Sequence, residues 1–279
     1  MDFSIIIPTY NNIDYLKLCI DSLKKNSKFS HEYIFHVNDG SDGTLHYLKE
    51  NNYKLTHSIE NIGLCRAVNN GSKIATKKFL VYAHDDMYFC PNWDVVLINE
   101  VNDIGHDNFY LSGTMIESKS GHISHNFGET FDSFQEDNLL SKYKDLNFYD
   151  HQGTHFAPHL VSKKMWDKVG GFSEEFNPGI GSDPDFNMKL WKEGVRIFKG
   201  LNDFKVYHFG SLTTRKKKNF IQNRGDKTFL KKWGISTKFF KKYYLKSKTK
   251  YNGPLNEPNV TIGYILGFLS CKIQSLFTF

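Results

Sequence analysis

The sequence predicts an α/β fold in which helices flank a mostly parallel central sheet, followed by a basic helical C-terminal region. Two observations predict the sheet. Short apolar runs alternate with amphipathic helical segments over residues 1–85, and polar residues follow the ends of those runs. The third observation concerns charge, because residues 205–250 hold 15 Lys or Arg against one acid, Asp226. The 279 residues, of which 15% are aromatic, are enough to bury a core.

The first elements are read from apolar spacing. Residues 3–8 form a continuous apolar run of strand length, which is typical of a strand buried on both faces. Ile13, Leu16, Ile20 and Leu23 then follow helical spacing, with Asn11 or Asn12 as the helix cap. Repeated units of this kind imply parallel strands joined by crossover helices. We expect further strands at residues 33–37, 55–59 and 79–83, and helices at 45–51 and 61–75.

The second half is less regular. We expect helices at residues 92–101, 161–169 and after 185 to about 193, and strands at 110–116, 195–198 and 205–208. Residues 117–158 have the composition of a loop, and basic helical segments follow residue 213. Residues 260–279 are largely apolar, but polar residues interrupt them, which makes them marginal as a membrane span.

Polar residues stand at the ends of three predicted strands. Asp85 and Asp86 follow the strand at 79–83, and such a pair can hold a divalent cation that clamps a diphosphate. A solvated turn is the alternative for the pair. Asp39 ends the second strand in a Gly/Ser turn, where its carboxylate can accept hydrogen bonds from a base or ribose, or form a plain Asx turn. Ligands of parallel sheets bind beyond this edge.

The order of several motifs resembles the family-2 glycosyltransferases, which have the GT-A fold, a Rossmann-like arrangement. The resemblance covers about residues 3–210. Its pieces are Ile-Ile-Pro-Thr-Tyr-Asn (6–11), Asn-Asp-Gly-Ser-Asp-Gly-Thr (38–44), Asn61-x-Gly63-x-x-x-Ala67-x-Asn69-x-Gly71, His84-Asp85-Asp86, Val-Gly-Gly-Phe (169–172) and Ser-Asp-Pro-Asp-Phe (182–186).

The resemblance implies a hexosyltransferase that moves a sugar from a nucleoside diphosphate sugar with inversion at the anomeric carbon. UDP is the commonest nucleotide of the family. The acceptor expected is a hydroxyl of a glycan, glycolipid or glycoprotein in surface polysaccharide synthesis. The donor-binding positions that match the family are Pro8, Thr9, Tyr10 and Asp39 for the nucleoside, and Asn61, Gly63 and Arg66 beside the ribose and diphosphate.

The same resemblance implies Mn²⁺ or Mg²⁺ as cofactor. Asp86 matches the last acid of the family's Asp-x-Asp metal motif, with Asp85 in the middle and His84 in place of the first acid. His208 matches a histidine that binds metal or diphosphate in several relatives. Imidazole can also ligate Mn²⁺, so the replacement at His84 is compatible with a metal site.

Asp183 matches the catalytic base of the family, while Ser182 replaces an acid that often precedes it. A carboxylate opposite the leaving group can accept the proton of the attacking hydroxyl. The alternative is that Asp183 is a helix N-cap, since Pro184 suits the first helical position. For the acceptor we expect weak contributions from Trp191, by stacking on a sugar ring, and from His155, in a loop with His151 and His159.

The charge distribution divides the chain into a catalytic domain at residues 1–210 and a basic helical extension at 211–279. The extension is expected to meet an anionic membrane surface or a polyanionic acceptor, while no nucleic-acid motif accompanies it. Four scattered cysteines and an N-terminal apolar run too short for a secretory signal favour the cytoplasm, with peripheral contact to the inner face of the membrane.

Two other functions remain open at this level. A nucleotidyltransferase also presents carboxylates at strand ends to metal and phosphate, but it needs no base such as Asp183. A nucleotide-sugar or glycan-binding module without catalysis is the other, favoured by His84 and Ser182 in place of acids.

Overall fold

Apolar runs build the centre of the sheet in the computed structural model, which describes residues 1–210 and 225–277. Strand β1 (Phe3–Tyr10) lies between β2 (Glu32–Asn38) and β4 (Phe79–Tyr82) and runs parallel to both. Every residue from Phe3 to Ile7 is buried, as expected for a strand covered on both faces. The carboxyl ends of these three strands therefore meet at one edge.

The rest of the sheet extends from this centre in the order β3, β2, β1, β4, β9, β6, β10, β5, with β7 beside β6 and β8 beside β10. Strand β9 is antiparallel to β4 and β6, and β5 and β8 are antiparallel to β10, whereas β6 and β10 are parallel. The remaining strands are β3 (Lys54–Ser58), β5 (Met87–Phe89), β6 (Phe109–Glu117), β7 (Ile123–Ser124), β8 (His151–Gln152), β9 (His159–Ser162) and β10 (Ile197–His208).

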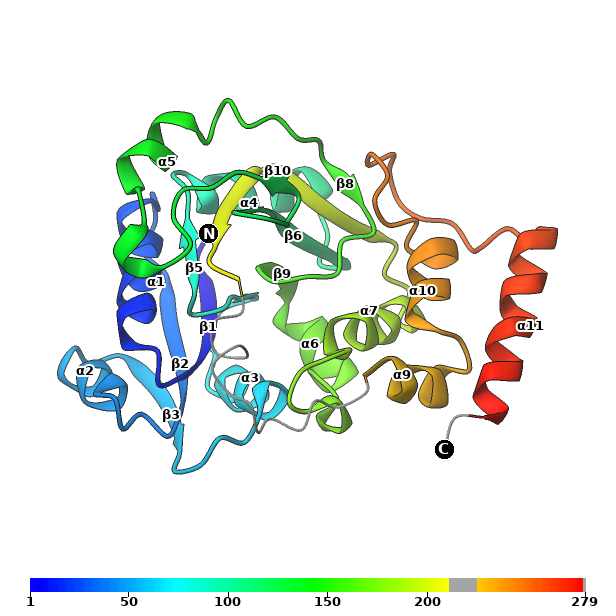
Figure 1. Cartoon of the computed structure of the whole chain (residues 1–279), viewed down its shortest axis with the longest axis horizontal. Coiled ribbons are helices and arrows are strands. Elements are labelled where there is room, and N and C mark those ends of the chain that lie inside the picture. Colours follow the sequence, from blue (N-terminus) through cyan, green and yellow to red (C-terminus); the bar gives the residue numbers. More distant parts are fainter. Residues whose placement is uncertain (211–224, 278–279) are drawn as a thin grey trace.

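Helices cover both faces of the sheet (Figure 1). Helix α3 packs closely on β1, because a Cβ added at Gly71 would lie 2.7 Å from Ile6. The helices before residue 210 are α1 (Ile13–Lys25), α2 (Thr44–Glu50), α3 (Leu64–Lys73), α4 (Trp93–Ile104), α5 (Glu136–Lys142), α6 (Lys163–Val169) and α7 (Ser182–Lys192), with short turns η1 (Phe131–Ser133) and η2 (Glu174–Phe176).

Most predicted elements of the first 116 residues are confirmed, and the differences lie later. The helix expected at 161–169 begins only at Lys163, because Val161 and Ser162 belong to β9. The two strands expected at 195–208 are one strand, β10, with a register shift between Leu201 and Lys205. Residues 117–158, expected as loop, contain β7, η1, α5 and β8.

The cap of α1 also differs from the prediction. Asn12 occupies the N-cap position but makes no capping hydrogen bond. The Ile13 amide instead donates to Asp42 Oδ2 at 3.0 Å, from the loop that follows β2. Asn11 does not cap the helix, and its side chain instead forms hydrogen bonds with Asp39 and Gly40 at the strand edge.

The C-terminal region shares the core of the sheet domain. Its elements are α9 (Gly225–Trp233), α10 (Thr237–Phe239), η3 (Phe240–Tyr244) and α11 (Ile262–Leu276). Phe229, Phe240 and Leu245 are fully buried in the same hydrophobic cluster as β1. The expected division at residue 210 thus falls within one continuous core, and residues 211–224 lie outside the described part.

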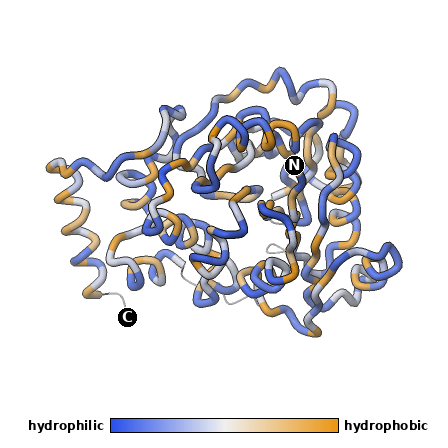
Figure 2. The backbone as a smooth tube through the Cα atoms, turned by 180° about the vertical axis from the view of Figure 1, so that it is seen from behind, coloured by the Kyte–Doolittle hydropathy of each residue, from blue (hydrophilic) through white to orange (hydrophobic). Residues whose placement is uncertain are grey.

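Helix α11 lies at the end of the molecule farthest from β2 and β3, and Figure 2 shows apolar residues along its length. Tyr264 and Phe268 pack toward α10, while a stripe of large apolar side chains is exposed. The stripe consists of Ile262, Leu266, Leu269, Ile273 and Leu276. Among the described residues, no helix has both the length and the apolar character needed to cross a membrane.

Candidate active site

The strand edge is joined by side-chain hydrogen bonds between neighbouring strand ends. At the end of β1, Thr9 donates its hydroxyl to Asp85 Oδ2 at 2.7 Å, which holds the segment after β4 against β1. Burial, followed by the charge of Asp86, raises the pKa of Asp85 to about 7. Asp85 therefore fits a role in holding the edge together, while Asp86 carries the negative charge.

Asp39 is held in place at the end of β2. Asn11 Nδ2 donates to Asp39 Oδ2 at 2.9 Å, and Asn11 Oδ1 accepts from the Gly40 amide at 2.9 Å. Hydrogen bonds from Asn11 and Ser41 lower the pKa of Asp39. The ionised carboxylate is partly exposed beside Pro8 and Tyr10 on the same edge. It can accept hydrogen bonds from a ligand that lies there.

The segment that carries Asn61 and Gly63 crosses the edge next to β2. Asn38 Oδ1 accepts from the Ile62 amide at 2.9 Å, and Asn61 Oδ1 accepts from the Gly63 amide at 2.9 Å. Gly63 has φ +84°, and a Cβ there would lie 2.6 Å from Asn177 Oδ1. Only glycine fits this close approach, which joins the start of α3 to the segment before α7.

Arg66 and Asn69 of the same helix have different surroundings. Arg66 Nε donates to Glu174 Oε2 at 2.8 Å in an exposed ion pair. Asn69 exchanges two hydrogen bonds with the backbone of Phe172, at 2.8 and 2.9 Å. Asn69 and Phe172 thus bind α3 to the loop after α6. Arg66 stays at the surface, where a solvated pair of this kind contributes little to stability and can open.

A candidate metal cluster forms where β4 and β10 end. His84, Asp86 and His208 each offer one ligand atom, and all three atoms lie within 4.8 Å of one another. His208 Nε2 lies 3.2 Å from Asp86 Oδ1, and His84 Nδ1 lies 4.0 Å from the same oxygen. Asp86 and His208 are buried, while the His84 side chain is 33% exposed. The cluster is therefore open on the side of His84.

The electrostatics of the cluster depend on a fourth residue, Glu117, at the end of β6. Burial opposes the charge of His208, but Asp86 and Glu117 raise its pKa to about 10. Glu117 Oε1 lies 2.6 Å from His208 Nδ1. Although burial opposes its charge, Asp86 has a pKa of about 2 because His208 is beside it. Burial lowers the pKa of His84 to about 4, so its imidazole is neutral at pH 7.

These residues fit a divalent cation. His208 Nε2 is buried and faces Asp86 Oδ1 at 3.2 Å. Glu117 orients the ring through the other nitrogen, as a carboxylate does behind many metal-bound histidines. Two imidazole nitrogens and one carboxylate oxygen suit Mn²⁺ better than Mg²⁺, which prefers oxygen ligands. Binding at His208 Nε2 requires loss of its proton.

Asp183 lies in the first turn of α7. Gly181, with φ +88°, occupies the N-cap position, so the alternative role of Asp183 as helix cap is contradicted. No hydrogen bond to its carboxylate occurs among residues 1–210 and 225–277. Burial raises the pKa of Asp183 to about 7, and Lys241 acts in the opposite direction. The carboxylate is thus unengaged and can take up a proton near neutral pH.

Tyr82 connects the surroundings of Asp183 and the metal cluster. Burial and then the charges of Asp183, Asp86 and Asp85 raise the pKa of Tyr82. The Tyr82 ring also lies 5.4 Å from the ring of His84. The Tyr82 ring also lies 5.1 Å from the ring of His159, which stacks on Phe186 of α7 at 5.8 Å. These ring contacts link the helix that carries Asp183 to the metal cluster.

The other acid of the Ser-Asp-Pro-Asp turn has a structural role. Asp185 is fully buried and accepts hydrogen bonds from Ser173 Oγ at 2.6 Å and Trp233 Nε1 at 2.8 Å. Lys232 Nζ lies 3.0 Å from the same carboxylate. Asp185 thus fastens α9 to α7, two residues from the candidate base.

The residues expected to bind an acceptor are separated by the structure. Trp191 is only 3% exposed, with Arg196 4.0 Å from its ring centroid and Tyr244 packed edge-on. The expected stacking of Trp191 on a sugar is wrong for this reason, because its faces are covered by core neighbours. His159 is buried on β9, and its Nδ1 forms a hydrogen bond with the Tyr110 hydroxyl at 2.9 Å.

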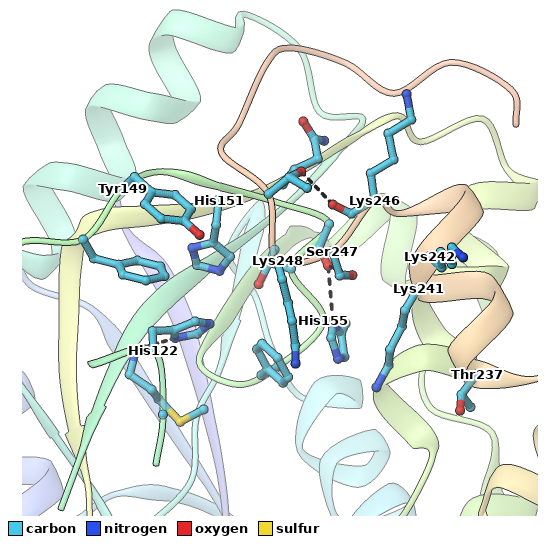
Figure 3. Close-up of a pocket in the computed structure, with 18 of the residues that line it drawn as sticks. His122, Tyr149, His151, His155, Thr237, Lys241, Lys242, Lys246, Ser247 and Lys248 are labelled. Carbon is cyan, nitrogen blue, oxygen red and sulfur yellow. Dashed lines mark hydrogen bonds between the residues drawn. The ribbon is translucent and has the colours of Figure 1, made fainter. Parts of the chain in front are cut away.

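His155 lines a cavity of about 1160 Å³ between the sheet domain and the C-terminal region (Figure 3). One wall comes from residues 115–156, including Glu117, His122 and His151, and the other from residues 237–249. Glu117 and the lysines of this cavity are not predicted as site residues, because no local pattern indicates which distant residues they meet. Asn187 Nδ2 donates to the Thr154 carbonyl at 2.8 Å and so joins this wall to α7.

Comparisons with known proteins agree on the family. The family model described as Glycosyl transferase family 2 matches residues 4–162. RP339, an uncharacterized glycosyltransferase of Rickettsia prowazekii, is 30% identical over 179 residues, 61% of this chain and 53% of that protein. A Campylobacter jejuni protein described as GalNAc(5)-diNAcBac-PP-undecaprenol beta-1,3-glucosyltransferase is 25% identical over 230 residues, 77% of this chain and 68% of that protein.

The fold of this chain also matches that of solved glycosyltransferase structures. The crystal structure of S. aureus TarS 1-349 in complex with UDP matches with a TM-score of 0.57 and 18% identity, over 74% of this chain and 60% of that one. This likeness shows the fold alone, and the fold is that of GT-A glycosyltransferases. The chain spans between about half and three fifths of the length of the first curated relatives it matches.

Proposed function

The chain belongs to glycosyl transferase family 2, and on that premise we propose that it transfers a hexose from a nucleoside diphosphate sugar to an acceptor hydroxyl. The transfer proceeds with inversion at the anomeric carbon and with a divalent cation, Mn²⁺ in preference to Mg²⁺. UDP is the favoured nucleotide, since the TarS structure of the same fold holds UDP.

One observation carries the proposal. A carboxylate without a hydrogen bond among the described residues, Asp183, lies in the first turn of α7, and the cation-compatible cluster of His84, Asp86 and His208 lies at the ends of β4 and β10. Ring contacts from His84 through Tyr82 and His159 to Phe186 connect the two. A sugar transferase needs both, because negative charge develops on the leaving diphosphate while the attacking hydroxyl loses its proton. A cation held by this cluster supplies Lewis-acid stabilisation of the diphosphate.

The protein residues have separate tasks in this scheme. Asp39 accepts hydrogen bonds from the nucleoside, and the amide-rich segment from Asn61 to Gly63 runs beside the ribose and diphosphate. Glu117 orients His208 through its Nδ1 at 2.6 Å. Asp183 accepts the proton of the acceptor hydroxyl on the side of the anomeric carbon opposite the diphosphate, and that geometry gives inversion.

The acceptor we propose is a lipid-linked or surface glycan, and the protein works at the membrane surface on the cytoplasmic side. The Campylobacter relative is described by an undecaprenol-linked substrate, which favours this class. The apolar stripe of α11 provides a surface that can lie on a bilayer, and α11 packs against the lysine-containing η3 through Tyr264 and Tyr243. Residues 1–210 supply the donor edge and the base, and the region after them supplies the membrane contact.

The test is release of nucleoside diphosphate from a panel of nucleotide sugars, with and without Mn²⁺. We expect Mn²⁺-dependent release from one donor, increased by an acceptor extract, and loss of release in Asp86→Asn. Tight binding of nucleotide sugar without release would instead favour the non-catalytic binding module. Incorporation of a nucleotide into product, with pyrophosphate release from a nucleoside triphosphate, would favour the nucleotidyltransferase.

A further inference from the structure

The cavity in Figure 3 has a wall that is rich in lysines. The wall lysines are Lys238, Lys241, Lys242, Lys246 and Lys248. Among the described residues, none of the five forms an ion pair. Lys199, in contrast, pairs with Glu100 at 2.7 Å and Asp150 at 3.1 Å. Among the described residues that line the cavity, Glu117 is the single acid, and it is already paired with His208. The cavity therefore holds excess positive charge.

Lys248 stands on a backbone segment that is fixed to the sheet domain. The Gln152 amide donates to the Thr249 carbonyl at 2.8 Å, and the Tyr251 amide donates to the Asp150 carbonyl at 2.7 Å. Ser247 Oγ donates to the Gly153 carbonyl at 2.7 Å. The segment from 247 to 251 thus runs along β8 like an added strand. The backbone that carries Lys248 is thus fixed before any ligand arrives, which lowers the entropy cost of binding.

Two of the lysines enter the same space. Figure 3 shows Lys241 and Lys248 extending on either side of His155, whereas Lys246 points away. Burial lowers the pKa of Lys241, the charges of Asp183 and Asp226 raise it, and Lys248 lowers it. Lys241 is therefore within electrostatic reach of both Lys248 and the candidate base. The hydrogen bond from Asn187 Nδ2 to the Thr154 carbonyl joins the pocket wall to α7, the helix whose first turn holds Asp183.

We propose that this lysine pocket binds a phosphate group of the acceptor, so that a hydroxyl near that phosphate reaches Asp183. This assignment rests on the proposed function, because it names the class of acceptor for the same site. Lys241 and Lys248 contact the phosphate, and the volume of about 1160 Å³ leaves room for sugar or polyol units attached to it. The acceptor is thus a phosphate-bearing glycan or polyol.

The donor diphosphate does not account for these lysines. It belongs at the cluster of His84, Asp86 and His208, where the protein offers a cation rather than lysines. The membrane surface is also a separate partner, because the apolar stripe lies on α11 and none of its residues lines the pocket. An acceptor phosphate is therefore the source that the position of the pocket favours.

The experiment measures binding of glycerol 1-phosphate to the full chain, by isothermal titration without nucleotide or metal, with glycerol as the neutral comparison. We expect saturable binding of glycerol 1-phosphate only. The double variant K241Q/K248Q should raise its Kd about tenfold or more, because charge-assisted hydrogen bonds to phosphate are lost. The control K227Q/K231Q removes the same charge from α9, outside the pocket, and should change Kd less than twofold.

Three results would overturn the pocket: equal weakening by both double variants, glycerol binding as tight as glycerol 1-phosphate, or no saturable binding by the folded protein. A fourth is loss of binding to 30% phosphatidylglycerol vesicles in K241Q/K248Q while glycerol 1-phosphate binding is unchanged, since the lysines then serve the membrane. UDP·Mn²⁺ binding by the same variants should match that of the native protein. If no donor releases nucleoside diphosphate although the phosphate results are as expected, only the transfer reaction is wrong.

Discussion

The ionisation of Asp183 is the residue-scale feature on which turnover depends. Its carboxylate makes no hydrogen bond among the described residues and lies within reach of Lys241. We predict that Asp183→Asn lowers kcat by roughly 10²–10⁴-fold, because the amide cannot accept the proton in the transition state. The Kd for UDP·Mn²⁺, measured by titration calorimetry, should stay within about threefold. An unchanged kcat would remove Asp183 from the mechanism.

The same residue predicts a pH profile. Because the pKa of Asp183 is about 7, kcat of the native protein should rise tenfold per pH unit below that value and level off above it. Stability should move in the opposite direction. The unfolded chain releases the Asp183 proton near 3.8 and the folded protein near 7, so the free energy of unfolding falls as pH rises between these values. Asp183→Asn should lack this part of the fall, which a urea titration at each pH can measure.

Glu117 is a positioning residue, since it reaches the proposed cation only through His208. We predict that Glu117→Gln weakens Mn²⁺ binding about 10–100-fold, because the ring of His208 loses its charged partner. The matched control is Glu129→Gln, which removes a carboxylate from an exposed pair with Lys119. Electron paramagnetic resonance counts free Mn²⁺ directly. Equal Mn²⁺ affinity of the two variants would show that Glu117 does not support the metal.

At the scale of elements, sequence pattern predicts what is local and misses what is distant. The ends of β1, β2 and β4 are predictable from the sequence, because each apolar run stops at polar residues. Strand β9 is misread because its short apolar run also fits the start of a helix, and nothing in residues 159–162 records that β4 and β6 lie on either side. The predicted cap of α1 is wrong for the same reason, since the capping carboxylate of Asp42 comes from another loop.

In the candidate site, too, residues within local motifs are predictable from sequence and residues that meet only in the folded protein are not. His84, Asp86 and Asp183 stand in motifs that a resemblance can identify. Glu117 lies 91 residues from His208 and has no motif around it, so only the pairing of β6 with β10 brings the two together. The lysines of the pocket are visible as charge in the sequence, but not as a wall opposite His155.

The apolar stripe of helix α11 can be tested for membrane contact. Leu266 is 63% exposed and Ile273 58% exposed on its apolar stripe. We predict that L266E/I273E reduces flotation with vesicles of 30% phosphatidylglycerol several-fold, because two charges on the stripe oppose insertion at the interface. N256E/N259E adds the same charge in the preceding loop and should reduce flotation less. Equal loss in the two variants would leave electrostatics, and not the stripe, as the cause.

For the whole molecule, the fastening of the C-terminal region to the sheet domain depends on Asp185. We predict that Asp185→Ala lowers the free energy of unfolding by about 2–4 kcal/mol, because Trp233 and Lys232 lose a buried partner. Ser173→Ala removes the donor to Asp185 and the hydroxyl that accepts from Lys232, leaves the Asp185 carboxylate in place, and should cost about 1 kcal/mol. Urea unfolding followed by tryptophan fluorescence measures both. A loss below 1 kcal/mol in Asp185→Ala would mean that apolar packing alone holds α9.

The strand-like run of residues 247–251 along β8 has a consequence for how such a protein diversifies. The groups proposed for the donor lie at or before residue 208, while one side of the pocket arrives about a hundred residues after the strand it borders. Recombination that exchanges only the end of the gene would therefore keep the nucleotide chemistry and alter what is glycosylated. Such an exchange must retain Lys232 and Trp233, the two anchors that Asp185 requires.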